Sequence, residues 1–488
     1  MAQDTGRWLY VAGSSDAPPD GSNAGDVIRW FRQERGLSQT EVAELLHTTQ
    51  SRVSKIENGD ILLKLDELRE VAARLSIPPE HFGVLPDCSA DSVPDPRQIS
   101  DLQGSEWESQ QAWRVVRSEL NAHRVTLSDL AADLYPGFAR IPGTTILTRD
   151  DWTPGEPVEL ADIRLTWRPD DRMPIPAITG SIEQTAHVRP LTATGARYRR
   201  YSLALRDLAR PRLLDNRFGY RLLDARWSAG KGVFEFGYTC YFDVLDVHEA
   251  VAHEFADAWL RAGRRRPSFA DLTLRRHVAD PFDLAARPVM PSINTLTIRR
   301  DPIDGHRIYL HRRDAKSVAA AGGMYHVIPA GMFQPAALAP AHQANDFSIW
   351  RNIQREYSEE FLGNPEHDEN SVDPVDYLNS DPFKSFMAAR DAGDFRVFVC
   401  ALVVEPLTLW IEFLTVAVIE GAVFDRLFAT MVARNDEGSA VGTAAGRPTV
   451  GIPFTSDSIQ RLRDEPLSPI ARACLTLAWE HRHRLLGA

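Results

Sequence analysis

Three glutamates late in the chain have the spacing of a site for a divalent cation. Glu356, Glu359 and Glu360 follow Arg355 in the segment REYSEEFLG, and on a helix these three positions lie on one face. Carboxylates held so close repel one another unless a cation lies between them, which favours a hard ion such as Mg²⁺ bound to phosphate oxygens. The structural alternative is an acidic helix face in solvent without a metal, because R-E-x-x-E-E is a short pattern.

The C-terminal part of the chain, over about residues 290–488, resembles a Nudix domain. The resemblance rests on a strand-rich lead-in, a Pro-x-Gly turn that ends at Gly331, and the R-E-x-x-E-E motif. It implies an α/β fold that uses Mg²⁺ to hydrolyse nucleoside diphosphates linked to another group, with Gly331 and Arg355 in the ligand site and Arg355 ion-paired to orient the acidic face. The residues it implies as metal ligands and, in an active enzyme, as catalytic groups are Glu356, Glu359 and Glu360.

Two departures from the Nudix pattern bear on catalysis. The segment between Gly331 and Arg355 is longer than the family spacing, with PAALAPAHQAND inserted, and the early glutamate of the motif is missing, Asp346 being the nearest acid. Altered loops change which substrate fits and can remove turnover while binding is retained. We therefore expect a non-catalytic sensor of a nucleotide-like metabolite, and the alternative is an Mg²⁺-dependent Nudix-type hydrolase that also binds DNA.

A second pattern with a chemical use lies near the N-terminus, in the segment LSQTEVAELLHTTQSRVSKIENGD. Ser38 and Glu41 predict a capping box, and a short turn separates this helix from a second one over 49–57. Up to Lys55 the second helix is polar except for Val53 and carries two positive and no negative charges. These charges favour contact with an anionic partner.

This segment resembles the Cro/repressor-type (XRE) helix-turn-helix over residues 25–83, an all-α DNA-binding domain. In that family the second helix enters the major groove, its N-terminal residues facing base edges. The resemblance implies a double-stranded DNA operator as partner. The base readers it implies, next to Thr49, are Gln50, Ser51 and Arg52, and the phosphate contacts are Gln39, Ser54 and Lys55. The alternative is a helical bundle that has lost its DNA role or that binds protein.

The two resemblances together predict a ligand-responsive transcriptional regulator. One helix-turn-helix domain makes few phosphate contacts, so useful affinity requires a homodimer on a two-fold operator. The Nudix-like domain would bind its nucleotide-type metabolite and change the spacing or the stability of that dimer. A DNA-bound scaffold without a ligand is a third alternative.

A third group of polar residues, in the helical stretch 247–260, contains the histidines and glutamates that a metallopeptidase helix would need. Two histidines on one helical face require H-E-x-x-H spacing, but His248 and His253 are five apart, and Asp257 occupies the i+4 position after His253. We therefore prefer an amphipathic helix with its charged side chains in solvent.

Composition excludes several classes of protein. The chain has 488 residues, 43% hydrophobic and 25% charged, which is ordinary for a globular protein. Four scattered cysteines, without a C-x-x-C pair, fit a reducing cytoplasm. A net charge of −12 argues against broad, charge-driven attachment to nucleic acid or lipid. We expect no secretory signal and no membrane partner, because the most apolar stretch, 395–424, holds too many charges for a span and is predicted as buried strands.

The sites must be positioned by several domains, so we predict a multidomain chain. Its parts are a disordered arm at 1–23, the all-α helix-turn-helix domain at 24–85, a linker at 86–104, an α+β middle domain at 105–289 that dimerises, and the α/β Nudix-like ligand-binding domain at 290–488. Apolar residues at helical spacing predict the core of the helix-turn-helix domain. They include Val27, Ile28, Val42, Leu45, Val53 and Ile56.

Overall fold

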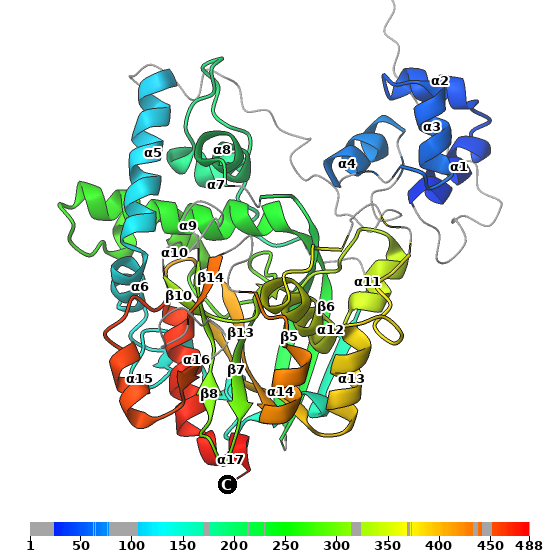
Figure 1. Ribbon diagram of the computed structural model, residues 1–488. Coiled ribbons are helices and arrows are strands. Elements are labelled where there is room, and N and C mark those ends of the chain that lie inside the picture. The colour runs from blue at the N-terminus through cyan, green and yellow to red at the C-terminus, as the bar shows by residue number, and fades with distance from the viewer. Residues whose placement is uncertain are drawn as a thin grey trace, which may run out of the picture. The chain divides into compact units, whose positions relative to one another are not determined.

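The computed structural model divides into two compact units, the first built on residues up to Pro86 and the second on the chain from Asp87 (Figure 1). The structure describes residues 24–61, 63, 65–75, 77, 106–168, 175–211, 214–228, 230–313, 324–367, 371, 373–432, 438–441 and 451–487. The arm predicted at 1–23 and the linker predicted at 86–104 lie outside the described residues.

Four helices form the described part of the first unit. They are α1 (Ala24–Glu34), α2 (Gln39–Leu45), α3 (Gln50–Glu57) and α4 (Leu65–Arg74). The predicted capping box is present at the start of α2, where Ser38 Oγ accepts from the backbone N–H of Glu41 and the Glu41 carboxylate accepts from the backbone N–H of Ser38. This local hydrogen bonding fixes where the helix begins.

The core of the first unit follows the predicted helical periodicity with one exception. Its buried residues include Val27, Ile28, Val42, Val53, Ile56 and Leu68. Leu45 was predicted in this core, but its side chain is 46% exposed, so that prediction is wrong. The buried face of α2 is centred between Val42 and Ala43, and at 100° per residue Leu45 lies about a third of a turn from that centre.

A mixed sheet of nine strands dominates the described part of the second unit. Its order is β1 (Ala139–Arg140), β2 (Leu147–Thr148), β12 (Phe395–Val404), β13 (Ile411–Glu420), β7 (Ser292–Arg300), β8 (Arg307–Ile308) and β15 (Ile452–Pro453), with β11 (Ala330–Met332) paired to β7 and β3 (Val158–Glu159) to β12. β13 and β7 are parallel, while β12 and β13 are antiparallel. The prediction of buried strands over 395–424 is confirmed by β12 and β13.

Two smaller sheets complete the strands. The first consists of β10 (Tyr325–Val327), β9 (Leu310–Arg313) and β14 (Gly438–Val441), and the second of β4 (Ile163–Trp167), β6 (Lys231–Cys240) and β5 (Phe218–Ser228). β4 pairs parallel to β6 and β5 pairs antiparallel to it. The pairing of β4 with β6 brings residues about 70 positions apart, such as Ile163 and Gly232, into one sheet.

Helices cover both faces of the large sheet. The described helices that follow Asp87 in the chain are α5 (Glu106–Ala122), α6 (Arg124–Ala132), α7 (Ile182–Thr185), α8 (Tyr201–Ala204), α9 (Tyr241–Arg261), α10 (Thr273–Val278), α11 (Pro340–Asp346), α12 (Ile349–Glu356), α13 (Phe383–Asp391), α14 (Gly421–Leu427), α15 (Ser456–Leu462), α16 (Pro469–Glu480) and α17 (Arg482–Leu486). A π-helical turn, η8 (Tyr357–Phe361), continues α12. Thr297 of β7 hydrogen-bonds to the Tyr357 hydroxyl at 2.8 Å.

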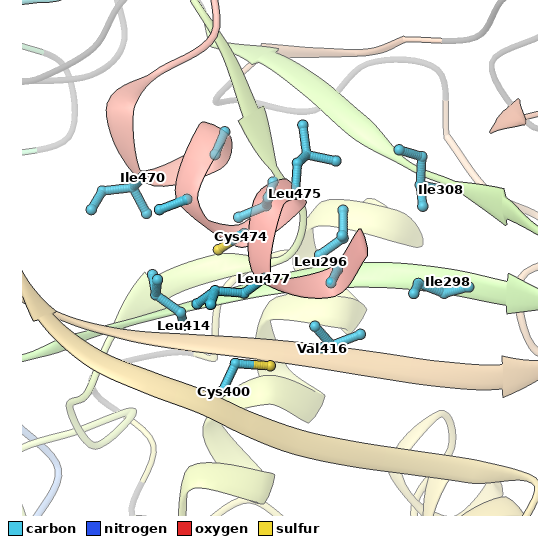
Figure 2. Packing of buried hydrophobic residues seen from close by; sticks show 14 of the residues in the cluster. Leu296, Ile298, Ile308, Cys400, Leu414, Val416, Ile470, Cys474, Leu475 and Leu477 are labelled. Carbon is cyan, nitrogen blue, oxygen red and sulfur yellow. The ribbon is translucent and has the colours of Figure 1, made fainter. Parts of the chain in front are cut away.

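Alternation along β7 places α16 and η8 on opposite faces of the sheet. Leu296 and Ile298 belong to the hydrophobic core under α16, together with Leu414 and Val416 of β13 (Figure 2). Because successive strand side chains point to opposite faces, Thr297 faces the other way, toward Tyr357 of η8. The sheet is therefore buried between two helical layers.

The predicted boundary near residue 290 does not separate two compact units. β2 and β3 come from the segment predicted as a middle domain, yet Leu147 and Val158 pair with Val404 and Val399 of β12. These strands have only two residues each, which is too short to produce an alternating pattern in the sequence. The α+β and α/β segments share one sheet and one unit.

Candidate nucleic-acid interface and ligand cavity

The N-terminal half of α3 exposes the residues that were predicted to read bases. Thr49 is the N-cap, and its hydroxyl accepts from the backbone N–H of Arg52 at 3.2 Å. Val53 and Ile56 are buried. The exposed residues are Thr49, Gln50, Ser51, Arg52 and Lys55, whereas Gln39 and Ser54 are half-buried. The helix thus turns its apolar face to the core and its polar face outward.

A chain of hydrogen bonds connects this exposed face to a buried carboxylate. The Gln50 side-chain amide donates to Gln39 Oε1 at 2.6 Å, and Gln39 Nε2 donates to Glu57 Oε2 at 2.9 Å. Glu57 is 1% exposed and also accepts from Arg32, at 2.5 Å from Nε and 2.9 Å from Nη2. The hydrogen bond and the charge of Glu57 raise the pKa of Arg32. The side chain of Gln50 is therefore positioned before any ligand binds.

The support that Glu57 gives to this exposed face is a feature that the sequence did not reveal. The sequence placed Glu57 at the end of the second helix, with no partner assigned. Its partner Arg32 lies on α1, 25 residues earlier, and Arg29 of the same helix donates to Asn58 Oδ1 at 2.8 Å. The available signal was a carboxylate next to the buried Ile56, which requires a cation or other donors nearby.

Arg52 is paired to a residue of α4. Its Nη2 lies 2.8 Å from Glu67 Oε1, with side-chain exposures of 44% and 41%. An ion pair this exposed contributes about 0–1 kcal/mol. The pair therefore orients Arg52 without preventing it from exchanging Glu67 for another acceptor.

A cavity of about 330 Å³ lies in the second unit and brings together four of the residues predicted in the Nudix-like site. They are Gly331, Arg355, Glu356 and Glu359. Glu360 is not among the lining residues. Its side chain is buried, and Oε1 accepts from the backbone N–H of Ala330 at 3.2 Å. Glu356 and Glu359 thus line the cavity, whereas Glu360 is hydrogen-bonded to the backbone of Ala330 in β11.

Gly331 lies directly against Glu356. A Cβ atom at position 331 would be only 1.9 Å from Glu356 Oε1. A side chain at position 331 would therefore displace the Glu356 carboxylate from its place beside strand β11. The contact fixes the position of Glu356 at the cavity wall.

Arg355 is ion-paired, as the resemblance implied, but with Asp346. Its Nη1 lies 3.5 Å from Asp346 Oδ2 and donates to the Tyr377 hydroxyl at 2.9 Å, and the Tyr377 hydroxyl donates in turn to Asp346 Oδ1 at 2.8 Å. Burial lowers the pKa of Arg355, but the charges of Tyr377 and Asp346 outweigh it and raise the pKa. The guanidinium of Arg355 is therefore held in place by Asp346 and Tyr377.

Acidic residues outnumber arginines around the cavity. Its acidic lining residues are Asp215, Glu249, Glu356, Glu359, Glu366, Glu405 and Glu412, and its arginines are Arg124, Arg217 and Arg355. Each arginine has an acidic partner, since Arg124 lies 2.9 Å from Glu249 and Arg217 lies 2.6 Å from Glu366. A phosphate group would enter such a site only with a cation that offsets the repulsion.

The predicted three-glutamate metal site is not assembled in the structure. Across the described ranges, no group of three His, Cys, Asp or Glu side chains has the arrangement that holds a metal ion. Glu360 is turned to Ala330, which leaves two of the glutamates at the cavity. These residues do not fit a resident three-carboxylate Mg²⁺ centre.

Helix α9 is buried on nearly all sides, so the prediction that its charged residues face solvent is wrong. Glu249 is 2% exposed and accepts from Arg117 and Arg124. Burial raises the pKa of Glu249, but these two arginines outweigh it and lower the pKa to about 2. Glu249 of this helix and its partner Arg124 therefore line one wall of the cavity.

The two histidines of α9 make structural contacts and point to different partners. The His248 ring bonds to Pro288 O at 3.1 Å through Nε2, while His253 Nδ1 lies 3.0 Å from the Tyr201 hydroxyl. Burial lowers both pKa values to about 3, so both rings are neutral near pH 7. Asp257 pairs with Arg261 at 2.6 Å. The preference against a zinc site agrees with these contacts.

Comparison with known families identifies the first unit. Residues 28–82 match the helix-turn-helix family HTH_3. Together with the geometry of α2 and α3, this match supports a DNA-binding transcriptional regulator of the XRE family. No curated protein matches the chain. Among the helices that the structure describes, none combines the length and the hydrophobicity that a membrane crossing requires.

Proposed function

We propose that the protein is a sequence-specific transcriptional regulator that reads its operator with α3. The observation that carries this proposal is the chain from Gln50 through Gln39 to buried Glu57, which fixes a side-chain amide at the exposed N-terminus of a helix. Amides recognise adenine through two hydrogen bonds, and a guanidinium such as that of Arg52 recognises guanine. Lys55 and Ser54 lie further along α3, where phosphate contacts position the helix.

The protein acts as a homodimer in this proposal. A single α3 contacts one half-site, and helix-turn-helix proteins bind two half-sites about one helical turn of DNA apart. The second unit, which contains most of the residues of the chain, supplies the dimer contacts. Its location is the cytoplasm, where the operator is accessible.

The second unit senses a nucleotide-type metabolite, bound together with its own Mg²⁺. The convergence of Gly331, Arg355, Glu356 and Glu359 on one cavity supports this role. The cavity is at the small end of the range of about 300–1,000 Å³ for ligand sites, and its acidic lining disfavours a bare phosphate. Glu356 and Glu359 would contact the ion that accompanies the phosphates, while Arg355 keeps the helix end in place.

Titration of ligands into a protein–operator complex tests the sensor. Nucleoside diphosphate sugars, ADP-ribose and dinucleotides, each with Mg²⁺, are added while DNA affinity is followed by fluorescence anisotropy on an operator selected from genomic fragments. We expect one class to change the affinity about 5- to 150-fold. Glu359→Gln removes that change and leaves affinity without ligand intact. No change with any ligand would eliminate the sensor.

The alternative function is a Nudix-type hydrolase. The observation that favours this alternative is that Glu356 and Glu359 both line the cavity. Phosphate release from the same compounds with Mg²⁺, abolished by Glu359→Gln and Glu360→Gln, would establish it. Because Glu360 is engaged with Ala330, we expect binding without turnover.

A further inference from the structure

The sheet face under α16 changes from apolar to polar at one end. Leu296 of β7 and Leu414 of β13 lie in the core that α16 covers (Figure 2). Since every second strand residue shares a face, Ser292 and Asn294 continue this face on β7, and Glu412 continues it on β13. Ser292 and Glu412 are directly paired in the parallel ladder.

These polar residues form a continuous hydrogen-bonded chain that ends at the start of α16. The Asn294 amide donates to Glu412 Oε2 at 2.7 Å, and Asn294 Oδ1 lies 2.9 Å from His326 Nε2. On the other side of the ring, His326 Nδ1 lies 2.6 Å from Ser468 Oγ. Ser292 also donates to Glu412. Four segments distant in sequence therefore meet in one relay.

The relay fixes the protonation of the histidine ring. Asn294 donates through Nδ2 to a carboxylate, so its Oδ1 is an acceptor. His326 must then carry its proton on Nε2, which leaves a lone pair on Nδ1 directed at the Ser468 hydroxyl. A serine whose base is oriented by a third group has the arrangement that activates a nucleophile.

The position of Ser468 gives this arrangement access to a substrate. Ser468, His326, Asn294 and Glu412 all line the cavity of about 330 Å³, although the serine itself is only 2% exposed. Ser468 is also the N-cap of α16, and its oxygen accepts from the backbone N–H of Ala471 at 3.1 Å. The positive end of the helix dipole stabilises negative charge that develops there.

We propose that Ser468 is a nucleophile for acyl transfer, with His326 as its general base, acting on a small carboxylic ester or thioester. Ser468 Oγ attacks the carbonyl carbon while its proton passes to His326 Nδ1. The bond to the leaving oxygen or sulfur breaks, and His326 returns the proton to the leaving alcohol or thiol. Water then attacks the acyl-serine in the same way, releasing the acid. The proposal does not rest on nucleotide sensing, although the residues of both proposed sites line the same cavity.

Covalent labelling of the full-length protein with a fluorophosphonate tests this proposal, together with hydrolysis of p-nitrophenyl acetate. Mass spectrometry should locate the adduct on Ser468. His326→Gln keeps hydrogen-bonding capacity but removes the base, and should slow labelling about 10²- to 10⁴-fold. Ser468→Asn retains a good N-cap residue, so the variant should fold and show neither label nor hydrolysis.

A matched control is Ser348→Ala, which removes the N-cap serine of α12, whose hydroxyl accepts from Arg351 at 3.3 Å. Its labelling rate should equal that of the wild type. An unlabelled Ser468 in the folded wild type, or equal hydrolysis by Ser468→Asn, would overturn the proposal and leave Ser468 as a cap only. Labelling of Ser468 is measured without nucleotide or DNA, so failure of the sensor and failure of this site are separate results.

Discussion

The amide of Gln39 donates a hydrogen bond to the buried carboxylate of Glu57 over 2.9 Å, and this contact joins the exposed start of the recognition helix to its buried end. The oxygen of the same Gln39 amide accepts from the side chain of Gln50. In the proposed mode of DNA binding, recognition therefore depends on a residue that does not face solvent. The contact also links α2 to α3, since each helix contributes one partner of the hydrogen bond.

Replacing Glu57 with Gln should weaken both the fold and the sequence preference of the first unit. Arg32 would lose its charged partner, and a lost hydrogen bond to a charged group costs about 1–3 kcal/mol. Hydrogen–deuterium exchange should show faster exchange of α1 and α3 amides. Glu44→Gln, at an exposed position of α2, is the control. Unchanged exchange in the Glu57 variant would contradict the role assigned to the network.

The sequence allowed the local part of this site to be predicted but not its support. The caps at Ser38 and Thr49 are encoded within a few residues, so the positions of both helices followed from the sequence. The partnership of Glu57 with Arg32 joins two different helices, and no short pattern reports it. Leu45 was misplaced because helical spacing alone does not say which of several adjacent apolar residues faces the core.

The cavity shows the same limit on a larger scale. Gly331 and Glu356 were recognised from a motif and do meet, whereas Glu249 enters the cavity wall from α9, a segment predicted to belong to another domain. The relay of Ser468 and His326 spans 142 residues. Contacts of this range arise only once the sheet has formed, so the sequence offered no spacing from which to read them.

Arg52→Ala and Lys55→Ala should separate base reading from phosphate contact. Removal of a guanidinium that contacts a base relaxes the preference at one operator position, at a cost of about 1–3 kcal/mol. Loss of a phosphate contact weakens all sequences similarly and reduces the salt slope by about 1. Selection from a randomised duplex library, repeated at several salt concentrations, measures both. If the two variants behave alike, α3 is not oriented in the groove as proposed.

Glu67→Gln should strengthen DNA binding by releasing Arg52 from its partner on α4. Arg52 must exchange Glu67 for a base or a phosphate when DNA binds, and an exposed pair of this kind is worth about 0–1 kcal/mol. We therefore expect up to about a fivefold gain in affinity, largest at low salt. Glu70→Gln, which removes an acid paired with Arg74 on the same helix, controls for the change in net charge. An equal gain in both variants would reject a specific role for Glu67.

Acid should destabilise the second unit through His248 and His253. Burial lowers both pKa values to about 3, while an unfolded histidine titrates near 6.5. Below pH 6.5 the two histidines therefore bind protons in the unfolded state but stay neutral in the folded state. The free energy of unfolding that is present above this pH is therefore lost as the pH falls toward 3. At pH 5 the loss is about 2 kcal/mol for each histidine. Urea unfolding at pH 7 and pH 5 measures it.

His253→Gln is the decisive variant for this pH dependence, because glutamine can accept from the Tyr201 hydroxyl without titrating in this range. The variant should be less stable than the wild type at pH 7, since the stacking of His253 on Trp113 is lost. Its further loss between pH 7 and pH 5 should nevertheless be smaller by about 2 kcal/mol. An unaltered pH response of His253→Gln would mean that this ring is protonated in the folded protein, and its place in the core of α9 would need another explanation.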